Sequence, residues 1–249
     1  MRKRELDHAE AVGYFPEIRK LIKQPTAPIW WWRDSHSCDG SILHNGTLCA
    51  IDTGERQICV TAGHVYEQYL RHRSEFDDVE CQIGNVRIRL ENYLIDYSKE
   101  LDLATFEISP ILLAGSGILN HAPRIWPPEC IETGEIVVLG GYPGRFREER
   151  IRQVEFAFAS LFVPVAQSSS DHASFQLNLS RAYWSDGSEG IPAHSELGGM
   201  SGGPVFRYLR NPIEHFDLAG FIYQGSPDYE LIFARHAACV TKSGNIVQY

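Results

Sequence analysis

Apolar residues near the start of the chain follow a helical spacing. Ile18, Leu21 and Ile22 lie three and four positions apart, so the segment before Pro25 has one apolar face. Proline interrupts a helix because it has no N–H and its ring clashes with the preceding turn. We therefore expect residues 1–28 to form an N-terminal extension that contains a short helix.

After this extension the chain consists of short apolar runs separated by turn residues. The first runs are IWWW, GSILHNGTLCAID, RQICVTAGH, ECQIGNVRIRLENYLI and DLATFEI, with candidate reversals at Asn45-Gly46, Thr53-Gly54 and Gly84-Asn85. The later runs are EIVVLGGYP, VEFAFASLFVPVA, ASFQLNLSR, GPVFRYL, FDLAGFIYQ and ELIFARHAACV. Strands at this spacing, with few long helical patterns, predict an all-β protein of two antiparallel barrels or sandwiches.

The two sets of strands are separated by a stretch that is rich in Gly, Ser and Pro and has little periodicity. This stretch predicts a linker over residues 111–134. We expect a first β-barrel over residues 29–110, a second over residues 135–240, and a C-terminal tail over residues 241–249.

Composition places the chain among globular proteins. Of its 249 residues 43% are hydrophobic and 22% are charged, which is enough apolar material for one large or two small cores. The net charge of −9 argues against binding to nucleic acid or to anionic membranes. No stretch approaches the roughly 20 apolar residues that span a bilayer, and MRKREL is not followed by the apolar core of a secretory signal. These features predict a cytoplasmic location.

Cysteines and histidines give no sign of a metal or cofactor site. The six cysteines form no CxxC pair, and the histidines show neither HxxxH spacing nor grouping with the cysteines. We expect reduced, mostly buried thiols, and we expect neither a metal nor a cofactor.

Three short segments carry residue types that together suit acyl transfer. VTAGHV places His64 just past an apolar strand, where its imidazole can face a cleft. ELDLATFEI places Asp102 inside an apolar run, where a carboxylate needs a partner, whereas the rival acids Asp96 and Glu100 lie at its polar edge. GGMSGGP places Ser201 among glycines. Taken alone, each segment also fits a structural role: a loop histidine, a paired acid and a tight turn.

Together the three side chains predict a nucleophile with its supporting groups. Ser201 would attack a carbonyl carbon, His64 would accept its proton, and Asp102 would hold the imidazole tautomer. The backbone N–H groups of Gly199 and Ser201 can point at one spot and form an oxyanion hole.

The segments TAGH, DLA and GxSGGP, in the order His, Asp, Ser, resemble those of chymotrypsin-type (trypsin-like) serine peptidases. VVLGGYPG resembles the opening of the second barrel in bacterial and HtrA-like members. The resemblance implies two six-stranded barrels with the active site at their interface. It also implies a serine endopeptidase that cleaves protein or peptide substrates through an acyl-enzyme.

The same resemblance assigns substrate-binding positions. Ser195 would lie at the base of the primary pocket, and its small neutral hydroxyl does not predict a preference for basic residues. Tyr223, Gln224 and Gly225 would lie along the substrate backbone. The nearby residues Glu230, Arg235 and His236 either enter this pocket or are solvated charges at a strand edge, and we favour the second interpretation.

Departures from the family leave a second function open. Met200 stands where secreted members have an Asp that pairs with a newly cleaved N-terminus, and Val65 replaces the cysteine that follows their catalytic histidine. Classical zymogen activation is therefore not expected. The alternative is a trypsin-like binding or signalling module that is inactive or that an activating protein partner switches on; an esterase is a third option.

GMSGG also matches the nucleophile elbow of α/β-hydrolases. That motif needs a strand before the serine and a helix after it. GSEGIPAHSEL is not a strand pattern, and Gly203-Pro204 opposes a helix start of that kind. We therefore exclude the elbow.

Overall fold

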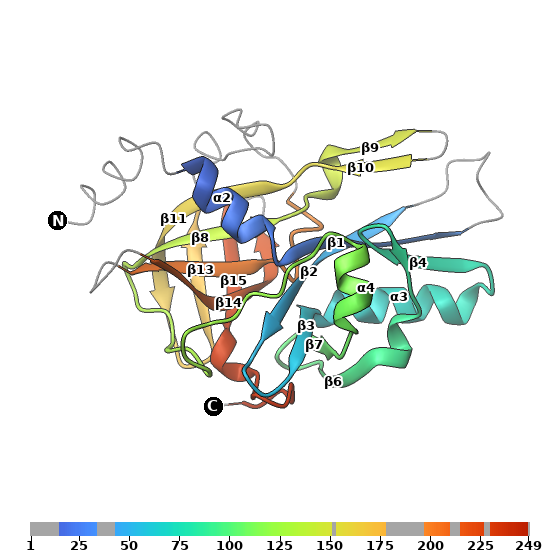
Figure 1. Cartoon of the computed structure of the whole chain (residues 1–249). Helices are drawn as coiled ribbons and strands as arrows, with labels where there is room; N and C mark the ends of the chain where they lie inside the picture. Colours follow the sequence, from blue (N-terminus) through green and yellow to red (C-terminus); the bar gives the residue numbers. More distant parts are fainter. Residues whose placement is uncertain are drawn as a thin grey trace.

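The computed structural model describes residues 15–33, 43–150, 153–177, 197–209, 215–226 and 230–248. Strands dominate these ranges, and the helices lie around them (Figure 1). The strands form a seven-stranded sheet in the first half of the chain, a closed six-stranded barrel in the second half, and a two-stranded sheet inserted in the second half. The predicted dominance of β-structure is therefore confirmed, and of the two predicted six-stranded barrels the one in the second half is confirmed.

The first sheet follows the order β5-β4-β1-β2-β3-β7-β6 and is antiparallel throughout. Its strands are β1 (Thr26–Arg33), β2 (His44–Asp52), β3 (Gln57–Ala62), β4 (Val79–Ile83), β5 (Val86–Arg87), β6 (Leu94–Ser98) and β7 (Leu103–Phe106). In β1 the side chains alternate, because Ile29 and Trp31 are buried while Trp30 and Trp32 are partly exposed.

A six-stranded barrel was expected here, and the structure differs. The sheet has seven strands, and within the described residues its end strands β5 and β6 do not pair with each other. Strand β5 is only two residues long, and the 3₁₀ helix η2 (Leu90–Tyr93) connects it to β6. A helical turn at this point takes the backbone out of the ladder that would close a barrel.

The barrel follows the order β11-β12-β15-β14-β13-β8. Its strands are β8 (Ile136–Gly141), β11 (Ala159–Ser168), β12 (His172–Gln176), β13 (Pro204–Leu209), β14 (His215–Ser226) and β15 (Leu231–His236). Along strand β8 the side chains alternate between the inside and the outside of the barrel. Val137 and Leu139 pack into the interior, whereas Val138 packs outside. The hairpin β9 (Arg147–Arg150) and β10 (Gln153–Phe156) forms the two-stranded sheet and projects over β1 (Figure 1).

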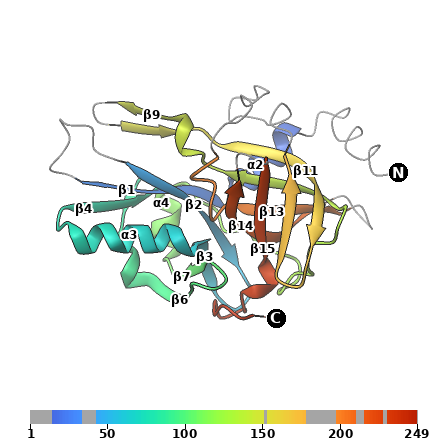
Figure 2. The same cartoon turned by 180° about the vertical axis from the view of Figure 1, so that it is seen from behind.

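Helices cover the edges of this framework. The longest described helix, α3 (Gly63–Glu75), follows β3 directly and runs along the first sheet (Figure 2). Helix α2 (Phe15–Lys23) packs Ile18 and Ile22 inward, and α4 (Pro110–Gly115) follows β7. The short 3₁₀ helices η3 (Gly144–Phe146) and η6 (Ala237–Cys239) follow β8 and β15. None of the helices in the described ranges is long and apolar enough to cross a membrane.

A shared apolar cluster joins the two halves. It combines outward-facing residues of the first sheet with outward-facing residues of the barrel and with helix α2. Its members include Ile22, Cys49, Ile51, Val60, Val138, Phe206 and Phe221. Because this cluster buries both surfaces, the two sheets have a fixed relative position along the line where they meet.

One predicted reversal is wrong. Asn45-Gly46 was expected to form a turn, but both residues lie within β2 and pair with β1. Gly46 serves a close approach instead, since a Cβ there would lie 2.6 Å from Cγ1 of Val65 on α3. The reversals at Thr53-Gly54 and Gly84-Asn85 do fall between strands.

Candidate functional site

A cavity of about 470 Å³ lies where the two halves meet. The first half contributes His64 and Asp102 to its lining. The second half contributes Ser201 together with Tyr223, Gln224 and Gly225. All six are among the residues expected at the site, and they come from four separate segments of the chain. Ser195, the expected base of the primary pocket, lies outside the described residues.

His64 is held at the start of α3 by two contacts with one carboxylate. Its ring atom Nδ1 lies 2.8 Å from Oδ2 of Asp102, and its backbone N–H donates to Oδ1 at 2.6 Å. The residue before the helix, Ala62, offers no side-chain cap. Asp102 therefore satisfies one of the free amides at the N-terminus of α3 while it orients the imidazole.

Asp102 lies in a turn, which corrects the prediction that it lies inside a strand. The turn ends at Asp102, β7 begins at Leu103, and the backbone of Asp102 has a φ of +52°. The apolar neighbours Leu101 and Leu103 suggested a strand in the sequence. Both are buried in the structure, but the strand includes only Leu103. Gly63 allows the close approach, since a Cβ there would lie 3.0 Å from Oδ1 of Asp102.

Three backbone carbonyls fix the loop that carries Ser201: one binds Gly144 of the second half and two bind Thr47 of the first half. The carbonyl of Gly198 accepts from the N–H of Gly144 at 2.7 Å. The carbonyl of Gly199 accepts from Thr47 Oγ1 at 2.7 Å, and that of Ser201 accepts from the Thr47 N–H at 2.8 Å. Strand β2 therefore holds the loop through both the backbone and the side chain of one residue.

These contacts also fix the direction of two amides. In a trans peptide the N–H points opposite to the preceding C=O. The carbonyl of Gly198 accepts from the N–H of Gly144. The carbonyl of Met200 accepts from the N–H of Gly203 at 2.8 Å. In the described part of the chain, the N–H groups of Gly199 and Ser201 donate to no protein acceptor. Within the described residues, both therefore have no acceptor that would compete with a ligand.

Gly199 cannot be replaced without a clash. Its φ is +96°, and a Cβ there would lie 2.4 Å from Nδ2 of Asn45 and 2.7 Å from the carbonyl oxygen of Tyr142. Asn45 in turn donates to that same carbonyl at 2.9 Å. The glycine lets the loop pack directly against β2 and the end of β8.

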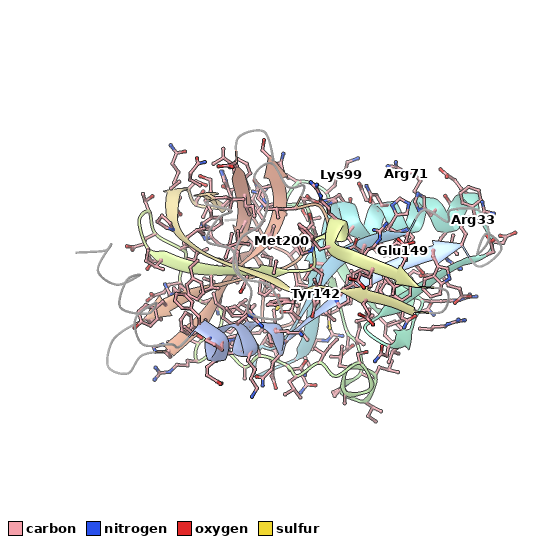
Figure 3. The ribbon with its side chains drawn as sticks, turned by 90° about the horizontal axis from the view of Figure 1, so that it is seen from above. Arg33, Arg71, Lys99, Tyr142, Glu149 and Met200 are labelled. Carbon is pink, nitrogen blue, oxygen red and sulfur yellow. The ribbon has the colours of Figure 1, made fainter. Side chains whose placement is uncertain are left out.

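Met200 is an apolar anchor of the loop. Its side chain is buried in the barrel core, and its backbone lies against Gly141, where a Cβ would be 3.0 Å from Cα of Met200. Figure 3 labels Met200 and Tyr142 near the middle of the molecule, where the strands of the two halves come together. Core packing therefore holds the loop at Met200, the position where the sequence resemblance would place an Asp in secreted members.

The expectation of solvated strand-edge charges is wrong for Arg235 and His236. Both are buried, with exposed fractions of 9% and 0%. The guanidinium of Arg235 contacts Asp171, and the His236 ring accepts from the N–H of Ile131 at 3.2 Å. Burial lowers the pKa of His236. Glu230 is partly exposed and lines the cavity.

The side chains that support the site were not predicted from the sequence. From β2, Thr47 binds the Ser201 loop and Asn45 binds the carbonyl of Tyr142 beside it, and from β15 Arg235 binds the turn before Asp102. Each of these contacts joins residues that are 97 or more positions apart in the chain. Thr47 stands in an ordinary strand pattern, Asn45 carried a turn signal, and Arg235 was expected to be solvated, so no local signal revealed these supporting roles.

The described part of the cavity wall combines polar and aliphatic side chains. Beyond the residues already named, Gly198, Met200, Ser226 and five aliphatic side chains line it: Leu177, Leu197, Ile222, Leu231 and Ile232. Within the described ranges, no group of three or more His, Cys, Asp and Glu residues is arranged to hold a metal ion.

Comparison with known proteins gives matches in structure only. No protein-family model and no curated protein matches the chain. The Rv3671c protease from M. tuberculosis in its active form is similar over 90% of this chain and 82% of its own, with 16% identity and a TM-score of 0.42. A structure described for the intrinsically disordered Sesbania mosaic virus VPg protein is similar over 85% of this chain and 91% of its own, with 12% identity and a TM-score of 0.45. Because both TM-scores are below 0.5, a functional assignment has to rest on the geometry of the cavity.

Proposed function

We propose that the protein is a serine endopeptidase that hydrolyses peptide bonds through an acyl-enzyme. The observation that carries this proposal is the double contact between His64 and Asp102 in a cavity that Ser201 also lines. A carboxylate on Nδ1 leaves Nε2 of the same ring to act on a proton, which is the arrangement that a general base needs.

In the proposed reaction Ser201 attacks the carbonyl carbon of the scissile bond. His64 takes the serine proton and then delivers it to the leaving amine, and Asp102 stabilises the charged imidazole. In the described structure no hydrogen bond joins the Ser201 hydroxyl to the His64 ring. In enzymes without bound substrate, the distance between a nucleophile and its general base is often too long for a hydrogen bond and shortens when substrate binds.

The amides of Gly199 and Ser201 would stabilise the oxyanion that develops during attack. Their preceding carbonyls are held by backbone donors, so the N–H groups are oriented before substrate arrives. Removal of one such donor costs about 3–4 kcal/mol in the transition state of comparable enzymes.

This arrangement also bears on the alternative of a partner-gated or inactive module. Met200 motivated that alternative because it removes the internal ion pair of secreted members. In this chain Thr47, Gly144 and the burial of Met200 hold the loop instead. We therefore propose that the site is active without cleavage of the chain and without a protein partner.

A fluorophosphonate that labels activated serines tests the proposal. We expect one adduct on Ser201 by intact mass and peptide mapping, none with Ser201→Ala, and greatly slowed labelling with His64→Ala. Purified protein should also cleave casein, whereas Ser201→Ala remains folded and inactive.

Two outcomes would count against the proposal. Casein cleavage by Ser201→Ala would remove the serine from the mechanism. Absence of both labelling and cleavage in the folded wild type would favour the partner-gated or inactive module.

A further inference from the structure

Arg235 on the barrel of the second half reaches across to the turn that carries Asp102. Its Nε donates to the carbonyl of Leu101 at 2.8 Å, and its Nη2 donates to the carbonyl of Glu100 at 3.2 Å. Only 11% of the Arg235 side chain is exposed. The guanidinium thus holds the carbonyls of the two residues that immediately precede Asp102.

The remaining arm of the guanidinium is fixed by Asp171. Nη1 of Arg235 lies 2.5 Å from Oδ2 of this carboxylate. The other oxygen of Asp171 accepts from the Ser169 hydroxyl at 2.9 Å and lies 3.0 Å from Nδ1 of His172. The hydrogen bond with His172 lowers the pKa of Asp171 to about 2, with Ser169 and Arg235 contributing. The partner of Arg235 is therefore both charged and positioned.

An aromatic ring closes one face of the guanidinium. Cζ of Arg235 lies 4.4 Å from the ring centroid of Tyr223. Tyr223 in turn lines the cavity together with His64 and Asp102. A guanidinium stacked on a ring and bonded through three of its nitrogens has a single orientation, which a lysine ammonium cannot reproduce.

The turn before Asp102 needs such a restraint. A φ of +52° is unfavourable for a residue with a side chain, and such conformations persist where the surrounding structure holds them. The Leu101 carbonyl belongs to the peptide plane that leads into Asp102. Because this carbonyl is bonded to Arg235, the plane is fixed from the opposite half of the molecule.

We propose that Arg235 is a positioning residue, which holds the turn of Glu100, Leu101 and Asp102 so that the Asp102 carboxylate keeps both of its contacts with His64. The inference rests on the proposed peptidase function. It adds a dependence of the site on a barrel residue that contacts neither His64 nor Ser201 in the described structure.

The test compares Arg235→Gln with Arg207→Gln. Arg207 is a matched control because it is also a buried arginine of the barrel, on β13, and pairs with a carboxylate, Glu129, at 3.2 Å. We expect Arg235→Gln to lower kcat and the rate of fluorophosphonate labelling by about 10- to 100-fold with little change in KM, since small displacements of catalytic groups have effects of this size. Arg207→Gln should lower the melting temperature to a similar extent and leave kcat unchanged.

Rescue experiments separate positioning from general stability. Arg235→Lys keeps the charge but not the fork, so kcat should remain well below that of the wild type. Guanidinium ion, added at concentrations that leave the melting temperature of the wild type unchanged, should raise the activity of Arg235→Ala but not that of Arg207→Ala. Equal kcat values for the Arg235→Gln and Arg207→Gln variants, or a change in KM alone, would overturn the proposal.

Hydrogen exchange gives a readout that does not depend on activity. The backbone amide of His64 donates to Asp102, so its exchange should accelerate in Arg235→Gln and not in Arg207→Gln. If the wild type proved inactive while this difference appeared, the peptidase function would fail and the positioning role would stand. Unchanged exchange at His64 would overturn the positioning role whatever the activity.

Discussion

The carboxylate of Asp102 serves the helix and the imidazole at the same time. One oxygen accepts from the backbone N–H of His64 and the other contacts Nδ1 of its ring. A carboxylate at a helix N-terminus interacts favourably with the helix dipole and with amides that have no partner in the helix. Two substitutions of this residue therefore separate its structural role from its proposed chemical role.

Asp102→Asn keeps an oxygen acceptor but not the negative charge that holds the imidazole tautomer. We expect kcat to fall by about 10⁴-fold with a small change in melting temperature. Asp102→Ala removes both contacts and should lower the free energy of unfolding by an additional ~1 kcal/mol. Casein or peptide turnover and thermal unfolding measure the two effects. Equal stability of the Asn and Ala variants would contradict the capping role.

At the scale of elements, strand β2 is the support of the Ser201 loop. The hydroxyl of Thr47 donates to the carbonyl of Gly199 and accepts from the N–H of Tyr142 at 3.0 Å. One buried side chain thus connects β2, the loop and the end of β8. The register between β1 and β2, which pairs Pro28 with Thr47, contributes to placing this side chain.

Thr47→Val preserves the shape of the side chain and removes this connection. The loss of a buried partner should lower the free energy of unfolding by ~1–3 kcal/mol. It should also lower kcat, by about 10- to 100-fold, because the loop loses its fixed position. Thr105→Val is the matched control: its buried hydroxyl donates to the carbonyl of Gly244 at 2.6 Å, away from the cavity. It should lose stability alone, and an equal fall in kcat for both variants would refute the support role of β2.

The strands around the cavity also bear on the choice of substrate. Ile222 of β14, Leu231 and Ile232 of β15, and Leu177, which follows β12, form an aliphatic part of its described wall. Burial of an apolar side chain contributes about 1.5–3 kcal/mol. We therefore expect peptides with an aliphatic or aromatic residue before the scissile bond to be cleaved about 10- to 100-fold more efficiently than peptides with Asp or Lys there. Profiling of a peptide library measures this preference, and efficient cleavage after Lys or Arg would contradict it.

At the scale of the whole molecule, the two halves share a core and also share the cavity. The joint cluster contains residues of the first sheet, of the barrel and of α2. His64 and Asp102 come from one side of the junction and Ser201 comes from the other. The distance from the His64–Asp102 pair to Ser201 therefore depends on how the two sheets pack, and not on either sheet alone.

Stability of the folded chain should depend on pH through His44. This ring stacks on Trp31 and lies beside His72 and Arg147, and burial together with these two neighbours lowers its pKa to about 4. The unfolded chain takes up a proton near the ordinary pKa of 6.5. Between pH 6.5 and about 4 the unfolded state thus binds more protons, so stability falls as the pH falls.

The variant His44→Phe keeps a stacking ring and removes the titrating group. Chemical unfolding at several pH values between 7 and 4 should show a smaller loss of stability for this variant than for the wild type. Parallel curves for the two proteins would show that His44 does not contribute to the acid sensitivity.

Much of the architecture was predictable because its signals are local. Alternation of apolar residues and the turn signals at Thr53-Gly54 and Gly84-Asn85 identified strands and reversals. The turn signal at Asn45-Gly46 failed, because a glycine that allows a close approach to Val65 looks the same in sequence as a glycine in a turn. Closure of a sheet is decided by pairing between distant strands, which explains why the open end at β5 was not predicted.

The sequence by itself determined the residues that could carry chemistry. Neighbouring residues in the sequence identified three of them: apolar runs flank His64 and Asp102, and glycines flank Ser201. The structure places all three at one cavity. Only the tertiary structure decided how these residues are held. The hydrogen bonds of Thr47 to the Ser201 loop and those of Arg235 to the turn before Asp102 join opposite halves of the molecule. No local pattern encodes such contacts, because they follow from how the two sheets pack.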